Sequence, residues 1–442
     1  MTLNSEQSRA LDAVKTGQNI FLTGSPGTGK SYTLRNIIEY LKTKNIKYAI
    51  TSSTGCAAVI IGGQTIHSYL GLGIGNNKID KIVLTLKKNK TKYTQLQELQ
   101  LLILDEISMI DDSTLTKISE VLKNVKNNKK PFGGIQVILV GDFCQLSPVE
   151  GQYAFQSDVW KELDLVCIQL TELIRQKDDK EFQEILQEVR FGKCSKNTIK
   201  QLAKLQNTTF DDIKPTKLYP LNSHVNAINN IEFEKLYLKN NKTSIDKAHI
   251  VDCWPINPNL EFEMDLLHIS EYDVNKDIFQ YYALTNDKKC NLDDYKIQLF
   301  KGLQVMVTRN INIDRGIVNG TTGIITSLNN LSVCIKCNNG IHHTINYHKD
   351  VNENNGTYVK FMPIRLAYAI SIHKSQGATL DAVEIDASTN IFAAGQLYTA
   401  MSRARNLNSI KLLNFDHYSF ICNPTVKEFY CVQNENIIAS KI

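Results

Sequence analysis

The 442-residue sequence has no run of 18 apolar residues, and we expect no secretory leader. Its first ten residues, MTLNSEQSRA, have neither a basic start nor an apolar core, so they do not fit an export signal. No segment is apolar for long enough to cross a bilayer. Ten cysteines are scattered without disulfide-like spacing, which favours a reducing compartment. We therefore expect an intracellular protein, without distinguishing nucleus, cytoplasm or a viral replication site.

Arginine and net charge are also scarce. Only 9 residues are Arg, against 41 Lys, and the formal net charge is +5. This balance excludes a histone-like polycation, but a modest basic excess still suits a protein that holds phosphates along a groove. The apolar fraction of 42% is ordinary for a folded protein, and the length predicts two to four domains.

Short apolar segments alternate with helical patterns over the first 170 residues. Four segments predict strands: 19–24, 47–53, 99–106 and 135–142. Their almost continuous apolar character is typical of strands buried on both faces of a parallel sheet. The alternation predicts a doubly wound α/β domain. Residues 171–192 then predict a helix, and TKLYPLN predicts a further strand.

Two stretches interrupt this pattern. The Lys-rich part of 71–98 lacks a convincing core pattern and is interpreted as a small surface insertion. Residues 232–362 contain short alternating segments separated by Gly, Asn and Asp, which indicates an inserted, mainly antiparallel domain. Its first half, 232–295, follows no recognisable pattern. The segment CIKCNNGIHHTINYH invites a zinc interpretation, but Cys334 and Cys337 would point to opposite faces of a strand, so we favour ordinary β-residues.

Residues 24–31 read GSPGTGKS, which fits the phosphate-binding pattern G-x-x-x-x-G-K-[ST] between a strand and a helix. The glycines let backbone N–H groups face phosphates, and the helix N-terminus adds a positive dipole. Lys30 would reach the β- and γ-phosphates, and Ser31 would ligate Mg²⁺. The sequence therefore predicts a bound nucleoside triphosphate with Mg²⁺.

Polar residues follow two further predicted strands. Asp105 and Glu106 stand where such an enzyme needs one carboxylate near the metal and another to orient or deprotonate water. Gln145 lies where it could contact the γ-phosphate or the water, although a loop glutamine alone is a weak signal. Gln7 either completes a capping box with Asn4 or reads adenine; the residues alone favour the cap.

These segments form an ordered set: GSPGTGKS, TSSTGCAAVIIGGQTIHS, LDEISM, PFGGIQVILVGDFCQLSPV, LIRQ, GIVNGTTG, AISIHKSQGATLD and QLYTAMSRAR. In this order they resemble the Pif-type (petite integration frequency) superfamily-one DNA helicases, close to the RecD-like group. The resemblance covers residues 3 to 410. It implies an α/β fold with two RecA-like lobes, a pin or wedge in the first and an SH3-like insertion in the second. The implied ranges are 1–170 for lobe one with the pin at 71–98, 171–231 with 363–442 for lobe two, and 232–362 for the insertion.

The resemblance also assigns site residues. It implies ATP as the nucleotide, with adenine read by Gln7, and catalytic roles for Glu106, Gln145, Arg175 and Arg403. Arg405 is interpreted as an ion-pair residue instead. The implied metal ligands are Ser31 and Asp105. The implied nucleotide contacts are Gln7, Gly24, Ser25, Pro26, Gly27, Thr28, Gly29, Lys30, Ser31, Gln376 and Gly377.

Single-stranded DNA is expected to cross both lobes. The candidate contacts are Ser53, Thr54, Gly55, Thr65, His67, Asn222, His224, His373, Lys374 and Ser375. Small polar residues can hold phosphates without reading bases. For His67 and His373 a packed core position is the alternative. The pin lysines Lys87, Lys88, Lys90 and Lys92 either touch the fork or keep a loop soluble.

The resemblance implies an ATP-dependent 5′-to-3′ DNA helicase that acts as a monomer on single-stranded and forked DNA. RNA–DNA hybrids and G-quadruplexes stay open as substrates, and replication, recombination and repair stay open as pathways. A nucleotide kinase is one alternative, but it leaves HKSQG and AMSRAR without roles. A catalytically silent DNA-binding scaffold is another, and the intact set of Lys30, Asp105, Glu106 and both arginines argues against it.

Overall fold

The structure is a computed structural model. It describes residues 3–439 except 55–56, 59–60, 74–76, 178, 211–214, 244–269, 274–277, 287–289, 310, 313–314, 316, 318–320, 338–339, 353–356 and 381. The chain divides into two compact units, residues 1–211 with 372–442 and residues 212–371. Among the described residues, no helix combines the length and apolar character that a membrane span requires.

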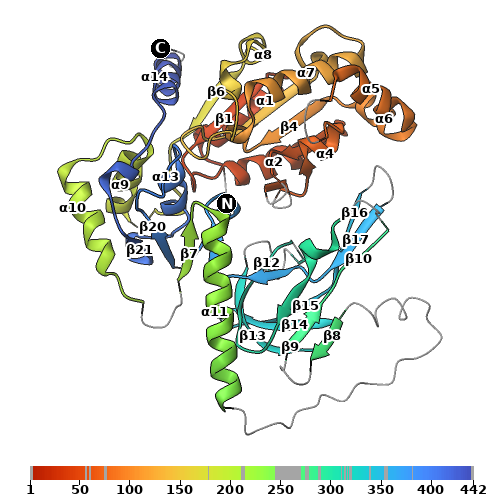
Figure 1. Cartoon of the computed structure of the whole chain (residues 1–442). Helices are drawn as coiled ribbons and strands as arrows, with labels where there is room; N and C mark the ends of the chain where they lie inside the picture. The colour runs from red at the N-terminus through yellow and green to blue at the C-terminus, as the bar shows by residue number, and fades with distance from the viewer. Residues whose placement is uncertain are drawn as a thin grey trace. The chain divides into compact units, whose positions relative to one another are not determined.

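The first unit is built on a six-stranded sheet in the order β3-β2-β4-β5-β1-β6 (Figure 1). Every neighbouring pair runs parallel. The strands are β1 Ile20–Gly24, β2 Tyr48–Ser52, β3 Gln64–Thr65, β4 Leu101–Asp105, β5 Gln136–Gly141 and β6 Val166–Leu170. The central strands β1, β4 and β5 are buried along almost their whole length, as their apolar runs predict.

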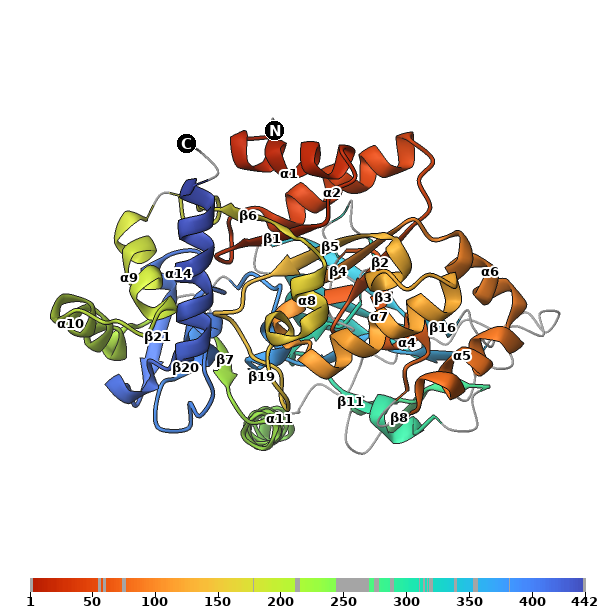
Figure 2. The same ribbon diagram turned by 90° about the horizontal axis from the view of Figure 1, so that it is seen from above.

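Helices cover both faces of this sheet. α1 (Ser5–Lys15) and α2 (Lys30–Thr43) lie along one face, and α7 (Asp112–Lys126) and α8 (Asp158–Glu162) lie along the other (Figure 2). In α2, the apolar residues recur at i, i+3, i+4 and i+7, and all four are buried against the sheet. The remaining principal elements of this unit are α4 Ile66–Leu70, α5 Ile79–Lys88, α6 Lys90–Glu98, α9 Lys180–Arg190, α10 Lys196–Lys204, β20 Val383–Asp386, α13 Gln396–Met401, β21 Ile410–Leu413 and α14 Pro424–Ala439.

The second unit is rich in antiparallel strands. Its sheets have the orders β15-β14-β13-β12-β18, β11-β9-β8 and β10-β17-β16. The strands are β8 Ser270–Asp273, β9 Ile278–Tyr281, β10 Leu284–Thr285, β11 Ile297–Leu299, β12 Gln304–Val307, β13 Thr322–Leu328, β14 Ser332–Cys337, β15 His342–Asn346, β16 His348–Asn352, β17 Thr357–Phe361 and β18 Ile364–Leu366. In β14, Cys337 is buried and Cys334 only partly so, which fits their opposite parity.

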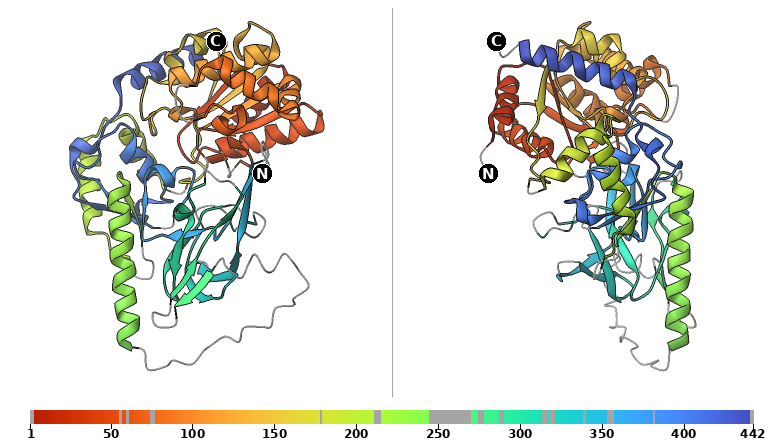
Figure 3. Two further views of the ribbon diagram at one scale, coloured as in Figure 1. Left: turned by 45° about the vertical axis from the view of Figure 1, so that its right-hand side comes forward. Right: turned by 90° about the vertical axis from the view of Figure 1, so that its left-hand side faces the viewer.

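A long helix, α11 (Asn222–Thr243), lies beside these strands within the second unit (Figure 3). It contributes Phe233 and Tyr237 to the edge of the unit's core, and the Phe233 ring is 5.0 Å from that of Phe300. The unit also contains a parallel pair, β7 (Thr216–Tyr219) and β19 (Ala369–Ser371). Of the residues that follow no sequence pattern, 232–243 are therefore helical and 270–295 contribute strands, while 244–269 lie outside the described residues.

The helix predicted over 171–192 is wrong in its first half. Helix α9 begins only at Lys180, where the Asp179 side chain accepts a hydrogen bond from the Phe182 N–H at 2.9 Å. The preceding chain is irregular because the backbone N–H groups of Ile174 and Arg175 donate to the Gly27 carbonyl at 2.9 and 3.2 Å. A tertiary contact with the phosphate loop thus replaces helical hydrogen bonds.

The expectation of a coreless insertion within 71–98 is also wrong. The segment forms helices α5 and α6, and α5 buries Ile82, Val83 and Leu86. In α6, Leu96 is fully buried. In α5, the buried residues Ile82, Val83 and Leu86 form a short apolar pattern with spacings of one and four positions. The many lysines around it made this pattern hard to recognise in the sequence. The predicted three-domain boundaries stay a prediction, since the first compact unit includes parts of both predicted lobes.

Candidate nucleotide site and strand track

The phosphate loop connects β1 to α2 and packs against two distant segments. Gly27 and Gly29 have φ values of 89° and 93°, which disfavour residues with a side chain. A Cβ atom at Gly27 would lie 2.7 Å from the Arg175 Cβ, and one at Gly29 would lie 2.7 Å from the Gln7 Nε2. The two glycines therefore allow the loop to touch the segments that carry Arg175 and Gln7.

Lys30, the first residue of α2, lies within this loop. Its Nζ donates to the Gly24 carbonyl at 2.7 Å and to the Ser25 carbonyl at 3.2 Å. Burial lowers the pKa of Lys30, while the negative charges of Asp142 and Glu106 oppose that shift. The loop thus holds a cation beside the N-terminus of a helix, an arrangement that attracts phosphate.

The acidic pair at the end of β4 is partly buried. Glu106 has left-handed backbone angles, φ 52° and ψ 47°, a costly conformation for a residue with a side chain and one that clusters at functional sites. Its N–H donates to the Asp105 Oδ1 at 2.9 Å. Burial and the neighbouring Glu106 raise the pKa of Asp105 to about 7, and burial raises the pKa of Glu106. Two crowded carboxylates are a favourable place for a cation.

The oxygen donors fit Mg²⁺. Asp105 offers a carboxylate whose ionised form is disfavoured by burial, so a bound cation would stabilise it. Ser31 follows Lys30 in the first turn of α2 and is exposed. A hydroxyl and a carboxylate are hard oxygen ligands of the kind that Mg²⁺ prefers. Both predicted metal ligands are thus chemically suited to it.

Gln7 forms the predicted capping box with Asn4, and its side chain still has an atom that could read adenine. Its N–H donates to the Asn4 Oδ1 at 2.9 Å, and its Oε1 accepts from the Asn4 N–H at 3.1 Å, so the capping box is present. Its Nε2 is buried and has no hydrogen-bond partner in the part of the chain that the structure describes. That nitrogen faces Gly29 of the phosphate loop. A buried unpaired donor is costly, which favours a role in binding.

Arg175 and Arg403 lie together. The Arg175 Nη1 donates to the Ser402 carbonyl at 2.9 Å, and burial with the nearby Arg403 charge lowers the pKa of Arg175 to about 9. Arg403 is 2% exposed; its Nη2 donates to the Ser402 hydroxyl at 2.8 Å and to the Gln145 Oε1 at 3.4 Å. Two guanidinium groups close to one another repel unless an anion lies nearby.

Gln376 connects this group to the acidic pair. Its Nε2 donates to the Glu106 Oε2 at 2.8 Å, and its Oε1 is buried without a partner among the described residues. Gly377 follows with φ 78°. Burial lowers the pKa of Arg403, and the charge of Glu106 opposes that shift. The structure therefore brings Glu106, Gln145, Gln376 and Arg403 into one connected site.

Sequence reasoning missed a buried polar network centred on Asp142. The Asp142 Oδ1 accepts from the Arg190 Nη2 at 3.0 Å and from the Tyr430 hydroxyl at 3.1 Å, and its Oδ2 accepts from the Tyr398 hydroxyl at 3.2 Å. The Tyr430 hydroxyl also lies 2.8 Å from the Thr23 Oγ1, next to the phosphate loop. Asp142 stands out in the sequence as a polar residue in VGDFCQL, but nothing in the sequence indicates which distant residues bind it.

The candidate DNA contacts differ in accessibility. His67 is exposed on α4, so the packed-core alternative does not apply to it; burial lowers the pKa of His67, with Asp111 opposing the shift. His373 is partly buried, and burial lowers its pKa. Lys374 is exposed. Ser375 is fully buried and its hydroxyl donates to the Ile372 carbonyl at 2.7 Å, so its contact with DNA stays a prediction.

Among the candidate DNA contacts between residues 53 and 65, the hydroxyl groups either accept hydrogen bonds from the backbone or are buried. The Thr54 and Thr65 hydroxyls accept backbone N–H groups at 3.2 Å, from Ala57 and Ser68. The Ser53 hydroxyl is buried without a partner among the described residues. Gly55 lies outside the described residues. In the second unit, Asn222 begins α11 and is exposed, and His224 is partly buried.

The insertion lysines divide into two groups. Lys87, Lys88 and Lys90 are exposed, as either interpretation of them requires. Lys92 is a correction: it is 8% exposed, and its Nζ lies 3.8 Å from the centre of the Tyr69 ring. Its charge stabilises the packing of α6 instead of facing a duplex.

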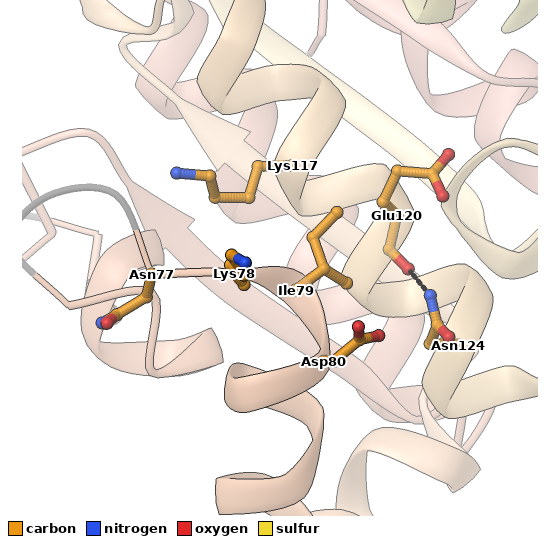
Figure 4. Close-up of a pocket in the computed structure, with 7 residues that line it drawn as sticks. All are labelled: Asn77, Lys78, Ile79, Asp80, Lys117, Glu120 and Asn124. Atoms are coloured by element: carbon orange, nitrogen blue, oxygen red, sulfur yellow. Dashed lines mark hydrogen bonds between the residues drawn. The ribbon is translucent and has the colours of Figure 1, made fainter.

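A separate open pocket of about 600 Å³ lies where α5 meets α7 (Figure 4). Its walls mix cations, anions and amides, and the Asn124 Nδ2 donates to the Glu120 carbonyl at 2.8 Å. The lining residues are Asn77, Lys78, Ile79, Asp80, Lys117, Glu120 and Asn124. None of the predicted nucleotide or DNA contacts is among them, so this pocket is not the nucleotide site.

The sequence and the fold of this chain are similar to those of known proteins. A family model described as PIF1-like helicase matches residues 2–200, and one described as DNA helicase Pif1, 2B domain, matches residues 289–328. The crystal structure of Pif1 helicase from Candida albicans is 31% identical, covers 97% of this chain and 99% of that one, and has a TM-score of 0.78. This chain belongs to the PIF1-like helicase family. The predicted family and fold class are thereby confirmed.

Other members of the PIF1-like helicase family extend the comparison. The ATP-dependent DNA helicase PIF1 of Xenopus laevis is 34% identical over 444 residues, which cover 97% of this chain and 64% of that protein. This chain therefore spans slightly less than two thirds of the length of that relative. A Pif1 helicase from Bacteroides, crystallised in complex with ADP-AlF3 and ssDNA, is 25% identical, covers 98% of each chain and has a TM-score of 0.67.

Proposed function

We propose that this chain is an ATP-dependent DNA helicase that moves 5′ to 3′ along single-stranded DNA and unwinds duplex ahead of it. The observation that carries the proposal is the buried Arg403, whose guanidinium donates to Gln145 and lies close enough to Glu106 for the two charges to interact. Such a group senses a γ-phosphate and couples its loss to movement. The polarity rests on the family alone.

The residues divide the hydrolysis step between them. Lys30 and the N-terminus of α2 bind the phosphates, and the Gln7 Nε2 binds the adenine edge. Mg²⁺ bound by Ser31 and Asp105 would neutralise charge on the phosphates. Glu106, held by Gln376, accepts the proton of the attacking water. Arg175 and Arg403 stabilise the charge that develops on the γ-phosphate.

The strand track is proposed from exposure and chemistry. His67 and Lys374 are the accessible side chains of the two first-unit motifs, and Asn222 is the accessible one on α11. Side chains of this kind bind phosphates without reading bases, as movement along any sequence requires. Each step must open a base pair, which costs about 0.6–2.2 kcal/mol of stacking. One ATP per base is sufficient for that cost.

The decisive assay measures ATP turnover with and without single-stranded DNA and then the unwinding of a fork with a 5′ tail. We expect DNA to stimulate ATP turnover strongly, and we expect unwinding of a duplex with a 5′ tail but not of one with a 3′ tail. Glu106→Gln should lose both ATP turnover and unwinding. DNA binding without turnover would support the silent scaffold instead, and phosphate transfer to a small acceptor would support the kinase. Forks with an RNA strand, a G-quadruplex substrate and sedimentation of the DNA complex test the proposed substrates and the monomeric state.

A further inference from the structure

Two cysteines from distant parts of the chain meet beside the nucleotide site. Cys144 follows β5 and directly precedes Gln145, whereas Cys422 lies two residues before α14. The two side chains interact: burial and the nearby Cys422 thiol raise the pKa of Cys144, and the Cys144 thiol lowers the pKa of Cys422. The Cys422 S–H donates to the Asn423 carbonyl at 3.8 Å. Neither residue belongs to the hydrolysis machinery described above.

The backbone holds both cysteines in place. Gly395 lies between the two segments: its N–H donates to the Ile421 carbonyl at 3.0 Å, and a Cβ atom on it would lie 2.5 Å from the Cys144 carbonyl oxygen. The Cys144 N–H donates to the Asp142 Oδ1 at 3.1 Å. On the other side, the Asn423 side chain accepts the Thr425 N–H at 2.9 Å. Gly395 therefore contacts the backbone of Cys144 and of Ile421, the residue before Cys422, so the two segments that carry the cysteines lie side by side.

The two thiols differ in access and in acidity. Cys422 is partly exposed, whereas Cys144 is 3% exposed. The neighbouring Cys144 thiol, helped by the charge of Lys427, lowers the pKa of Cys422. Burial raises the pKa of Cys144. An accessible, more acidic thiol beside a buried second thiol is the arrangement of a reactive cysteine with its resolving partner.

We propose that Cys422 and Cys144 form a redox-modification site, at which hydrogen peroxide produces a disulfide that slows ATP hydrolysis. The Cys422 thiolate attacks one peroxide oxygen, the O–O bond breaks, and hydroxide leaves, which gives a sulfenic acid. The Cys144 sulfur then attacks the Cys422 sulfur, the S–O bond breaks, and the Cys144 proton leaves with the hydroxide as water. One peroxide is reduced to two waters, and two thiols are oxidised to one disulfide.

The effect on turnover follows from the position of Cys144. A disulfide is about 2.05 Å long, shorter than any hydrogen bond between thiols, so its formation draws the two segments together. Gln145 is the next residue and accepts from the Arg403 Nη2 at 3.4 Å. We expect kcat for ATP to fall several-fold with KM nearly unchanged, because Gln7 and Lys30 lie outside the linked segments. This effect rests on the proposed ATPase activity; the disulfide itself does not.

The test treats the full chain with hydrogen peroxide and maps its peptides by mass spectrometry without reduction. We expect a linked peptide pair containing Cys144 and Cys422, and a fall in turnover that dithiothreitol reverses. Cys422→Ser removes both the link and the peroxide effect. Cys431→Ser is the matched control, since Cys431 is exposed on α14, and it behaves like the wild type. Cys422→Ala replaces the serine variant if the latter does not fold.

Three outcomes would overturn the proposal: no linked pair at peroxide concentrations that oxidise Cys431, an unchanged turnover in linked protein, or a loss of turnover that persists in Cys422→Ser. A reduced protein without ATPase activity would count against the proposed function instead, and the peptide map would still decide whether the bond forms.

Discussion

Arg403 is a buried cation held by neutral oxygens, the Thr399 carbonyl at 3.0 Å, the Ser402 hydroxyl and the Gln145 amide. Burial of a charge is costly unless an anion compensates it. The charge of Glu106 contributes to that compensation, and a γ-phosphate would contribute more. At the scale of a single residue, this is the clearest sign that the site is built for a polyanion.

Replacing Arg403 with Ala should lower kcat for ATP by about 10³–10⁵-fold, the usual contribution of an arginine finger. ATP affinity should change little, because the groups that bind the phosphates and the base remain. Steady-state ATPase rates with single-stranded DNA and equilibrium binding of a non-hydrolysable analogue measure the two effects. Arg405→Ala, at an exposed position, is the matched control. Turnover at the wild-type rate in Arg403→Ala would refute the assignment.

Asp105 links the site to stability. Its pKa in the folded protein is about 7, far above its ordinary value, so the folded state holds the proton more tightly than the unfolded chain does. The stability from this group is therefore present at low pH and is lost as pH rises toward and past 7. Asp105→Asn should raise the Tm of the nucleotide-free, metal-free protein by a few degrees at pH 8 and by less at pH 5.

Thermal denaturation in the presence of a chelator at both pH values measures this difference. Asp158→Asn, at a side chain that is 90% exposed, controls for the loss of an aspartate. A Tm increase of equal size at pH 5 and pH 8 would contradict the role of burial. The same variant should lose Mg²⁺-dependent ATPase activity, an expected conflict between stability and function.

The positions of the candidate nucleotide-site residues in the fold were largely predictable, because these residues lie at the ends of strands that the sequence makes obvious. Asp105 and Glu106 follow an apolar run, and the ends of neighbouring parallel strands meet at one edge of a sheet. The left-handed backbone of Glu106 was not predictable, since nothing in the residue type requires it. Nor was it evident that Gln7 could cap α1 with its Oε1 and still present its Nε2 to the loop.

At the scale of helices and strands, the sequence-based predictions failed where tertiary contacts determine the local structure. Residues 171–177 have helical composition, but their backbone binds Gly27 of the phosphate loop. In α5 and α6, a narrow buried stripe is enough to form helices although lysines dominate the composition. The local sequence pattern predicts secondary structure poorly where a few contacts from elsewhere in the chain determine the backbone conformation.

Lys92 provides a test at this scale. Its ammonium group lies over the Tyr69 ring and its side chain is buried between α4 and α6. Lys92→Ala should lower the free energy of unfolding by about 1–2 kcal/mol, the size of a desolvated cation–π contact with the packing of its stem. Chemical denaturation measures it. Lys90→Ala, exposed in the same helix, should change stability by less than about 0.5 kcal/mol. Equal effects of the two variants would mean that the ring contact contributes nothing.

At the scale of the whole molecule, the order of motifs predicted the family, but no local pattern predicted the Asp142 network. Its partners Arg190, Tyr398 and Tyr430 lie 48, 256 and 288 residues further along the chain. Their convergence depends on the completed fold. The network connects β1 and the end of β5 in the first-unit sheet with helices near the end of the chain, so α14 is part of the buried core of the first unit.

Tyr430 is the residue at which this connection can be broken with least disturbance. Its hydroxyl contacts Thr23 and Asp142 and accepts the Phe143 N–H at 3.1 Å, while its ring stays packed, so Tyr430→Phe removes only the oxygen. Because a buried backbone donor and a hydroxyl then lose their partner, unfolding should become easier by about 1–3 kcal/mol.

The network also reaches the phosphate loop, since Thr23, whose Oγ1 lies 2.8 Å from the Tyr430 hydroxyl, directly precedes Gly24. Tyr430→Phe should therefore lower kcat for ATP at a temperature where the variant is fully folded, with a smaller change in KM. Tyr93→Phe, at a partly exposed ring in α6, controls for the loss of a hydroxyl. A loss of stability with unchanged kcat would show that α14 only supports the fold. Loss of both would make the C-terminal helix a determinant of how the loop engages ATP.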